Sequence, residues 1–279
     1  MCIEVIHMKK IKNKDKKGHI IAVTNQKGGT GKTTVTINVG VALSKMGYKV
    51  LVLDNDEQTN LTTGLIVDNV LYKEKNLGNL LDDVLDEKKI RLNRYIIHLR
   101  YVDIIAGCRN LFTYKEEFRN RKNRNTIYRD VLEQARYKYD FILIDCPPVA
   151  GIENAQAYTA ADSILVVSEP SMYSMDGIVD AVRIVGEARI TENPKLRVLG
   201  VVVNKMHFMR SEDKGYVNEI RSMCNGKVHV FDSIIPESAA IARCASLGKS
   251  ILQHRSTSKA AYAFLDLAQE IVKEVSSDA

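Results

Sequence analysis

The chain has 279 residues, of which 45% are hydrophobic and 27% charged, with a formal net charge of +6, so length and composition suit one α/β domain of an ordinary soluble protein. No apolar run approaches the roughly 18 residues that a membrane-spanning helix needs. The five cysteines form no CxxC pair, which disfavours a disulfide framework or a structural zinc site and indicates a reducing, cytoplasmic location.

The N-terminal segment, residues 1–18, is basic. It holds six lysines against Glu4 and Asp15, a local net charge of +4, which leaves the rest of the chain at +2. It has no apolar stretch followed by a cleavage site, so it is not a secretory signal, and we expect a disordered leader. One domain is expected over 19–275 and a short tail over 276–279. A nucleic-acid-binding surface must therefore be local or lie in the leader.

Strand and helix patterns alternate along the rest of the chain. Apolar runs predict buried strands at 20–24, 50–53, 102–105, 141–144, 163–167, 198–203 and 228–231. Amphipathic stretches predict helices at about 33–46, 77–87, 125–137, 152–160, 176–190, 214–224, 238–246 and 257–275. This order predicts an α/β fold: a doubly wound, mostly parallel sheet flanked by helices. In such a sheet, ligands bind beyond the C-terminal ends of the strands.

A glycine-rich stretch follows the first predicted strand directly. It consists of Lys27, Gly28, Gly29, Thr30, Gly31, Lys32, Thr33 and Thr34. Glycines let successive backbone N–H groups converge on an anion, and the helix that follows adds the positive end of its dipole. The order strand, glycine loop, Lys-Thr and helix predicts a phosphate-binding loop, in which Lys32 reaches the β- and γ-phosphates and Thr33 takes a Mg²⁺ position.

The first lysine of this stretch narrows the family. KGGTGKT resembles the deviant Walker A motif of the ParA/MinD family of P-loop ATPases, and it is closest to ParA/Soj-type partition proteins. The resemblance implies that Lys27 crosses a dimer interface to the nucleotide of the partner, so that Lys27 and Lys32 both act in catalysis and ATP joins two subunits. Judged by its residue type alone, Lys27 could also be an ordinary solvated loop cation.

An acidic segment follows the second predicted strand. A carboxylate at a strand end, two residues from another, can reach Mg²⁺ and an attacking water beside a triphosphate. Residues 54–64 resemble the switch I segment of ParA proteins, commonly D-x-D-P-Q-G-N-x-T. The resemblance implies that Asp56 orients the water and that Asp54 helps to hold the metal. Glu57 replaces the usual proline and Thr59 the usual glycine, two departures that bear on the stiffness of the loop and on turnover.

The remaining motifs follow in the family's order. Residues 139–148 resemble a Walker B strand that ends in D-C-P-P, which implies a metal role for Asp145 and a structural one for Cys146. Residues 160–167 and 173–178 resemble the A-A-D-S strand and the dimer-facing helix after it. Asn204 and the pair Pro236-Glu237 end later strands and are expected to line the adenine pocket. The resemblance covers about residues 19–275.

Members of this family differ in function, and the cysteines and the last predicted helix of this chain bear on which of these functions it has. Cys108 and Cys146 fit the ParA pattern without an iron–sulfur cluster. Over residues 261–275 the last predicted helix carries one lysine and three acids, and it is followed only by the tail. Its apolar stripe is therefore expected to pack on the core, and no MinD-like membrane anchor is visible.

Several basic residues in the C-terminal half are candidates for contacts with DNA phosphates, which need a positive field rather than base-reading side chains. The main candidates are Arg210, Arg243, Lys249 and Arg255. Ala240 stands where many ParA proteins carry a basic residue. A second basic run, residues 119–124, is either an additional patch for DNA or a solvated loop, and we favour the solvated loop.

Together these features predict an ATPase of DNA partition that needs Mg²⁺ and cycles between ATP and ADP. The resemblance implies a homodimer that binds DNA non-specifically when ATP-bound, that associates with the nucleoid, and that is released when a ParB-like protein stimulates hydrolysis. The alternatives are a MinD-like positioning ATPase and a nucleotide-gated scaffold with little turnover.

Overall fold

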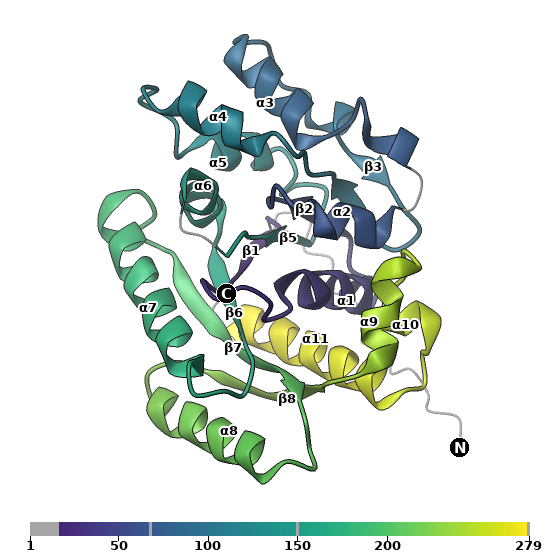
Figure 1. Cartoon of the computed structure of the whole chain (residues 1–279). Helices are drawn as coiled ribbons and strands as arrows, with labels where there is room; N and C mark the ends of the chain where they lie inside the picture. Colours follow the sequence, from purple (N-terminus) through teal and green to yellow (C-terminus); the bar gives the residue numbers. More distant parts are fainter. Residues whose placement is uncertain (1–16, 67–68, 149–150, 278–279) are drawn as a thin grey trace.

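A computed structural model describes residues 17–66, 69–148 and 151–277. Most of the expected leader and the last two residues of the tail therefore lie outside the described residues. Eight strands form one sheet in the order β3-β4-β2-β5-β1-β6-β7-β8, and helices cover both of its faces (Figure 1). The predicted fold class, a doubly wound and mostly parallel sheet, is confirmed.

Seven of the strands are parallel to their neighbours, and a short edge strand is not. The parallel strands are β1 (His19–Thr24), β2 (Val50–Asp54), β4 (Asp103–Ile105), β5 (Phe141–Asp145), β6 (Ser163–Ser168), β7 (Arg197–Met206) and β8 (Val230–Pro236). The edge strand β3 (Ile97–His98) runs antiparallel to β4. β1, β2, β5 and β6 are buried along almost their whole length, as expected for central strands covered on both faces.

Two apolar cores lie against the two faces of the sheet. On one face pack α1 (Lys32–Lys45), α2 (Asn60–Leu65), α9 (Ala239–Ser246), α10 (Ile251–His254) and α11 (Lys259–Ser277). On the other pack α3 (Leu77–Leu85), α4 (Leu111–Phe118), α5 (Ile127–Leu132), α6 (Ile152–Ala160), α7 (Ser174–Thr191) and α8 (Ser211–Cys224). The central strands thus hold their C-terminal loops at one edge between two helical layers.

The apolar stripe of α11 packs on the core, as predicted. Phe264, Leu267 and Ile271 are fully buried, and the helix contacts α1 and β8. Among the helices of the described ranges, none combines the length and the apolarity that a membrane crossing requires.

The sequence-based boundaries differ most where strands are short or polar. β8 was predicted at 228–231 but extends to Pro236, because the backbone N–H groups of Asp232 and Ser233 bond the Glu270 carboxylate on α11 and an edge strand tolerates such polar residues. The helix predicted over 125–137 is only α5, and α2, α4, α10 and β3 were not predicted.

Candidate nucleotide-binding site

The glycine loop joins β1, which lies between β5 and β6, to α1. Gly29 has φ 78° and Gly31 has φ 90°, backbone conformations that L side chains rarely adopt. A Cβ at Gly31 would also lie 2.2 Å from the Asn204 side-chain nitrogen. Glycine is therefore required at Gly31 on two counts, and the loop can curl tightly at the N-terminal end of α1.

Lys32 is buried beneath this loop, with 7% of its surface exposed, and its Nζ donates to the Lys27 carbonyl at 3.2 Å. Burial lowers the pKa of Lys32, against the opposite effect of the Asp145 carboxylate. The buried Thr30 hydroxyl has no hydrogen-bond partner among the described residues. Buried polar groups normally have hydrogen-bond partners. The Lys32 ammonium and the unpartnered Thr30 hydroxyl are therefore available to bind an anion in the loop.

Two carboxylates meet at the sheet edge beside the loop. Asp54 and Asp145 are register partners at the ends of β2 and β5. Burial and the neighbouring Asp54 raise the pKa of Asp145 to about 8. Its Oδ1 accepts from the Thr36 hydroxyl at 3.3 Å, whereas its Oδ2 has no partner in the described part of the chain. An unpaired, buried carboxylate oxygen next to Thr33 is a ligand of the type that Mg²⁺ prefers.

Asp54 is engaged differently. Its Oδ2 accepts from the backbone N–H of Thr62 at 2.8 Å and from the Thr62 hydroxyl at 2.6 Å, and its Oδ1 accepts from the Asp56 N–H at 3.3 Å. Burial raises the pKa of Asp54 to about 6, although the Thr62 bonds favour the carboxylate. Asp54 therefore anchors the start of α2 to the sheet, a contribution that the sequence motif did not reveal.

Asp56 lies half-buried at the turn between β2 and α2. Its Oδ1 accepts from the Gln58 N–H at 3.0 Å, and its carbonyl accepts from the Thr59 N–H at 2.9 Å. Thr59 has φ 52°, in the left-handed region that glycine occupies without strain. The family's usual glycine at this position thus has a conformational reason, and Thr59 adopts the same backbone at a cost of about 1–2 kcal/mol.

Lys27 points across the mouth of the loop to the segment that follows β6. Its Nζ pairs with Glu169 at 2.7 Å, donates to the Ser171 hydroxyl at 3.3 Å, and lies 5.9 Å from the centre of the Tyr173 ring. Glu169 belongs to none of the motifs recognised in the sequence. Its position directly after a buried parallel strand is a signal that could have identified it.

The end of β7 closes the other side of the loop. Asn204 donates from Nδ2 to the Thr30 carbonyl at 2.8 Å, and Lys205 donates to the Gly29 carbonyl. The Lys205 ammonium is also 3.8 Å from the Glu169 carboxylate. The backbone of Lys205 has φ 59°, in the left-handed region. In this structure, then, the Asn204 amide supports the loop. Lys205 is a loop contact that the sequence motifs missed.

Pro236 and Glu237 lie at the end of β8, one strand beyond Asn204. Pro236 is the register partner of Met206, and the Glu237 N–H donates to the Met206 carbonyl at 3.1 Å. The Glu237 carboxylate pairs with His207. These contacts place the pair at the same edge of the sheet as the glycine loop.

The four basic candidates are all exposed but do not form one group along the fold. Arg210 is the residue before α8, whereas the other three lie along the α9–α10 segment. Those three are Arg243, Lys249 and Arg255. Arg210 therefore belongs to a different element from the other three.

Comparisons with known proteins match most of the chain, and the matched family model includes the glycine loop. A family model described as an AAA domain matches residues 18–198. The chain is 30% identical over 257 residues to the chromosome partitioning protein ParA of Myxococcus xanthus, covering 92% of this chain and 88% of that protein. It is 30% identical to the sporulation initiation inhibitor protein Soj of Bacillus subtilis, covering 91% and 98%. The septum site-determining protein MinD from Pyrococcus horikoshii, solved with Mg-ADP, has a TM-score of 0.72 at 29% identity, covering 94% of this chain and 99% of that chain.

Proposed function

Because the chain belongs to the ParA/MinD family of P-loop ATPases, we propose that it is a ParA-type partition ATPase of the cytoplasm. ATP binding builds a homodimer that holds DNA non-specifically at the nucleoid, and hydrolysis, stimulated by a ParB-like partner, dissolves it. One observation carries this proposal: Lys27 and Lys32 flank one glycine loop, one at its open mouth and one buried beneath it. Two lysines so placed can serve two nucleotides, one in each subunit.

The residues around the loop fit Mg·ATP. The backbone of Gly28, Gly29 and Gly31 is proposed to cradle the phosphates, with Lys32 on the β- and γ-phosphates and Thr34 at the start of the helix. Asn204, Pro236 and Glu237 are proposed to border the base. Mg²⁺ neutralises charge on the transferred phosphoryl group.

Three side chains are proposed to serve the metal. The unpaired Oδ2 of Asp145 and the Thr33 hydroxyl are the direct candidates. Asp54 is committed to Thr62, so its proposed part is to hold the surrounding loop and the hydration shell in place. Asp56 is proposed to orient the attacking water from the adjacent turn.

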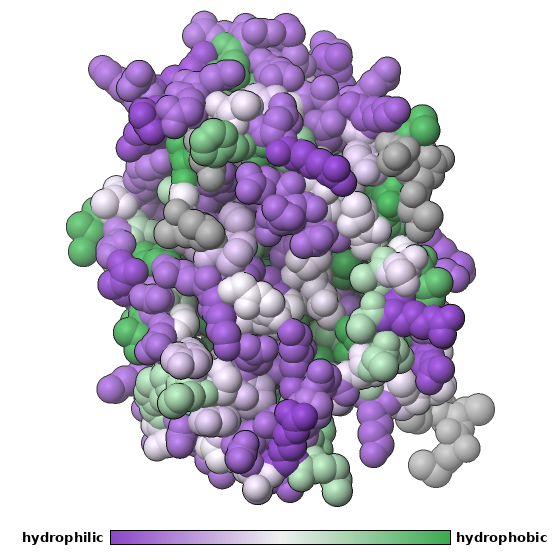
Figure 2. Space-filling view, viewed as in Figure 1, coloured by the Kyte–Doolittle hydropathy of each residue, from purple (hydrophilic) through white to green (hydrophobic). Residues whose placement is uncertain are grey.

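An exposed apolar surface supports a dimer. Large apolar side chains stand in solvent on α7 and just before it, and green atoms mark the left edge of the molecule over this helix (Figure 2). They are Met172, Tyr173, Val179, Val182 and Ile190. Apolar patches of this kind mark interaction sites. The patch begins next to Lys27, because Tyr173 contacts that ammonium.

Asp145→Asn is expected to raise the thermal midpoint of the nucleotide-free protein by a few degrees at pH 8. It is also expected to remove the extra increase in thermal midpoint that Mg²⁺ gives to the ADP-bound protein. Because burial raises the pKa of Asp145 to about 8, its contribution to the free energy of unfolding is present at pH 4 and is lost as the pH rises through 8. An amide has no such charge to bury.

Differential scanning fluorimetry at pH 4.5 and pH 8 tests this expectation. The difference between variant and wild type should be small at the lower pH, where the wild-type carboxyl is protonated. Equal Mg²⁺ responses in variant and wild type would remove Asp145 from the metal site.

DNA binding by the ATP-bound dimer is the direct test of the proposed function. Fluorescence anisotropy with a labelled duplex is expected to show binding with ATP and Mg²⁺ and little with ADP, regardless of sequence, with affinity that falls as salt is added. If the wild-type protein fails to bind duplex DNA at low salt in ATP and also in ADP, the DNA part of the proposal is contradicted.

A nucleotide-gated scaffold with little turnover is the second candidate, and Thr59 favours it. Thr59, three residues after Asp56, holds a left-handed backbone conformation that glycine adopts without strain, and Glu57 stands in the same turn where the family usually has proline. Phosphate release with and without DNA separates this candidate from a partition ATPase. A MinD-like membrane role is less favoured, because the apolar stripe of α11 is packed on the core; co-sedimentation with liposomes in ATP tests it.

A further inference from the structure

The positive charge of the folded chain is concentrated in one part of it. Residues 69–138, which include α3, α4 and α5, hold 16 Lys and Arg against 10 Asp and Glu. Residues 139–279, which carry Arg210, Arg243, Lys249 and Arg255, hold 14 against 18. A polyanion is attracted to the summed field of a surface and not only to single cations. The field thus favours the α3–α5 part over the C-terminal half.

The densest run of cations in this part is the α4–α5 loop, residues 119–124, here called the basic loop. Two of its arginines are used to hold it: Arg121 donates to the Leu85 carbonyl at 2.8 Å and lies over the Phe118 ring, and Arg124 donates to the Arg119 carbonyl at 2.7 Å. The loop therefore has a defined shape, fixed by its own cations against α3 and α4.

The other two cations of the basic loop face solvent. Lys122 is exposed and has no ion-pair partner within the described ranges. In the part of the chain that the structure describes, the ion-pair partner of Arg119 is Glu116 at 2.8 Å, and both side chains are more than half exposed. An exposed pair of this kind is worth at most about 1 kcal/mol, so Arg119 can exchange Glu116 for a phosphate at little cost.

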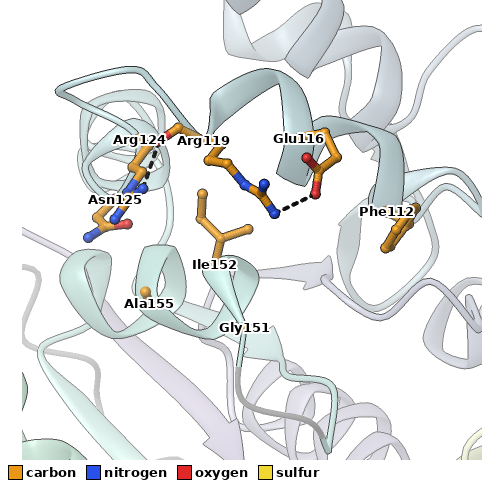
Figure 3. A pocket seen from close by; sticks show the side chains of 8 residues that line it. All are labelled: Phe112, Glu116, Arg119, Arg124, Asn125, Gly151, Ile152 and Ala155. Atoms are coloured by element: carbon orange, nitrogen blue, oxygen red, sulfur yellow. Dashed lines mark hydrogen bonds and ion pairs between the residues drawn. The ribbon is translucent and has the colours of Figure 1, made fainter.

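The basic loop stands as a ridge between two hollows of about 550 and 540 Å³. Figure 3 shows Arg119 and Arg124 beside the first hollow, over Ile152 and Ala155 of α6. Across the two hollows, the linings carry Lys88, Arg119, Arg121, Lys122 and Arg124 against Glu87, Glu116 and Asp130. On the face shown in Figure 2, the surface over α3 and α4 is mainly hydrophilic. A cationic loop with a surface hollow on each side is accessible to the backbone of a polyanion.

The basic loop is also tied to the nucleotide edge of the sheet. Gln156 on α6 donates to the Arg124 carbonyl at 2.6 Å. α6 begins at Ile152, shortly after Asp145 ends β5. The basic loop is thus bonded to α6 as well as to α3.

We propose that the basic loop binds the phosphate backbone of double-stranded DNA, with Arg119 and Lys122 as the contacting side chains. This inference rests on the proposed DNA binding by the ATP-bound dimer, but assigns it to a surface other than the α8–α10 candidates. Arginine and lysine donors recognise backbone phosphates without reading bases, which fits sequence-independent binding. This proposal takes residues 119–124 as a DNA-contacting patch rather than as the solvated loop that the sequence alone favours.

The test compares duplex affinity in ATP and Mg²⁺ over a salt series for three double variants. Arg119→Gln with Lys122→Gln removes the two contacting charges and leaves the bonds of Arg121 and Arg124 intact. Arg221→Gln with Lys227→Gln, on and after α8, removes the same charge elsewhere as the matched control. Arg243→Gln with Lys249→Gln removes the competing candidates. Sedimentation in ATP confirms that each variant still assembles as the wild type does.

The loop variant is expected to bind at least about 10-fold more weakly at 0.1 M salt, with a slope of log affinity against log salt that is smaller by about 2 for each loop on the DNA. The control should bind as the wild type does. A loop variant with wild-type affinity and slope overturns the assignment while the proposed function stands. A wild type that binds no DNA in ATP overturns both.

Discussion

Asp56→Ala is expected to lower the rate of ATP hydrolysis at least about 100-fold and to leave an ATP-bound dimer that does not dissociate. Groups that position or deprotonate an attacking water contribute factors of about 10² to 10⁴. One Asp56 oxygen accepts from the Gln58 N–H. The β2–α2 turn is also held by bonds that do not use this carboxylate: Asp54 accepts from Thr62, and the Thr59 N–H donates to the Asp56 carbonyl. Removing the carboxylate should therefore not unfold the turn.

Phosphate release under saturating ATP, together with sedimentation of the same sample, measures both consequences. Asp86→Ala, which removes an exposed surface acid paired with Lys88, is the matched control and should hydrolyse ATP at the wild-type rate. If the Asp56 variant turns over ATP as fast as this control does, the attacking water is positioned by another group. Loss of the dimer together with loss of turnover would instead give Asp56 a structural role.

The fold followed from the sequence because its central strands are continuous apolar runs. Four consecutive apolar residues bounded by polar ones, as at 141–144 in β5, favour a parallel strand that is covered on both faces. The short elements, α2 and β3 among them, were not predicted because six or fewer residues carry too little periodicity. Their positions are set by long-range bonds, such as that between Thr62 and Asp54, which local pattern does not contain.

The candidate site was predictable to the same depth. Its glycines and carboxylates were predicted because their chemistry depends on residue type and spacing along the chain. The contacts of Glu169 and Lys205 were not, because they join segments that lie more than 130 residues from the loop in sequence. The missed residues are thus those that hold the loop in its present state, and they bear directly on Lys27.

In the single chain, Lys27 is engaged by its own subunit. The Lys27 ammonium forms an ion pair with the Glu169 carboxylate at 2.7 Å, and the same carboxylate lies 3.8 Å from the Lys205 ammonium. One acid thus faces two cations across the mouth of the loop. A lysine that serves the partner's nucleotide must first leave this pair. The pair is partly exposed, so separating Lys27 from Glu169 is expected to cost no more than about 1 kcal/mol. Attraction between the ammonium and the negatively charged triphosphate can offset this cost.

Lys27→Ala is accordingly expected to bind ADP with wild-type affinity, to remain monomeric in ATP, and to lose at least about 1,000-fold in turnover. A cation supplied across an interface to a transferring phosphoryl group is worth about 10³ to 10⁵ in rate. Isothermal titration with ADP, light scattering in ATP and phosphate release measure the three parts. ADP affinity that falls together with turnover would place Lys27 in its own subunit's phosphate site.

Glu169→Gln separates the two states of Lys27. The amide keeps the shape of the side chain but no longer holds the ammonium by charge, so this variant is expected to dimerise at a lower ATP concentration than the wild type. Glu116→Gln, which weakens an exposed surface pair with Arg119 at the end of α4, is the matched control and should dimerise as the wild type does. A Lys27→Ala protein that still dimerises in ATP would show that the seam between subunits closes without this cation, and the Glu169 variant would then have no reason to shift the equilibrium.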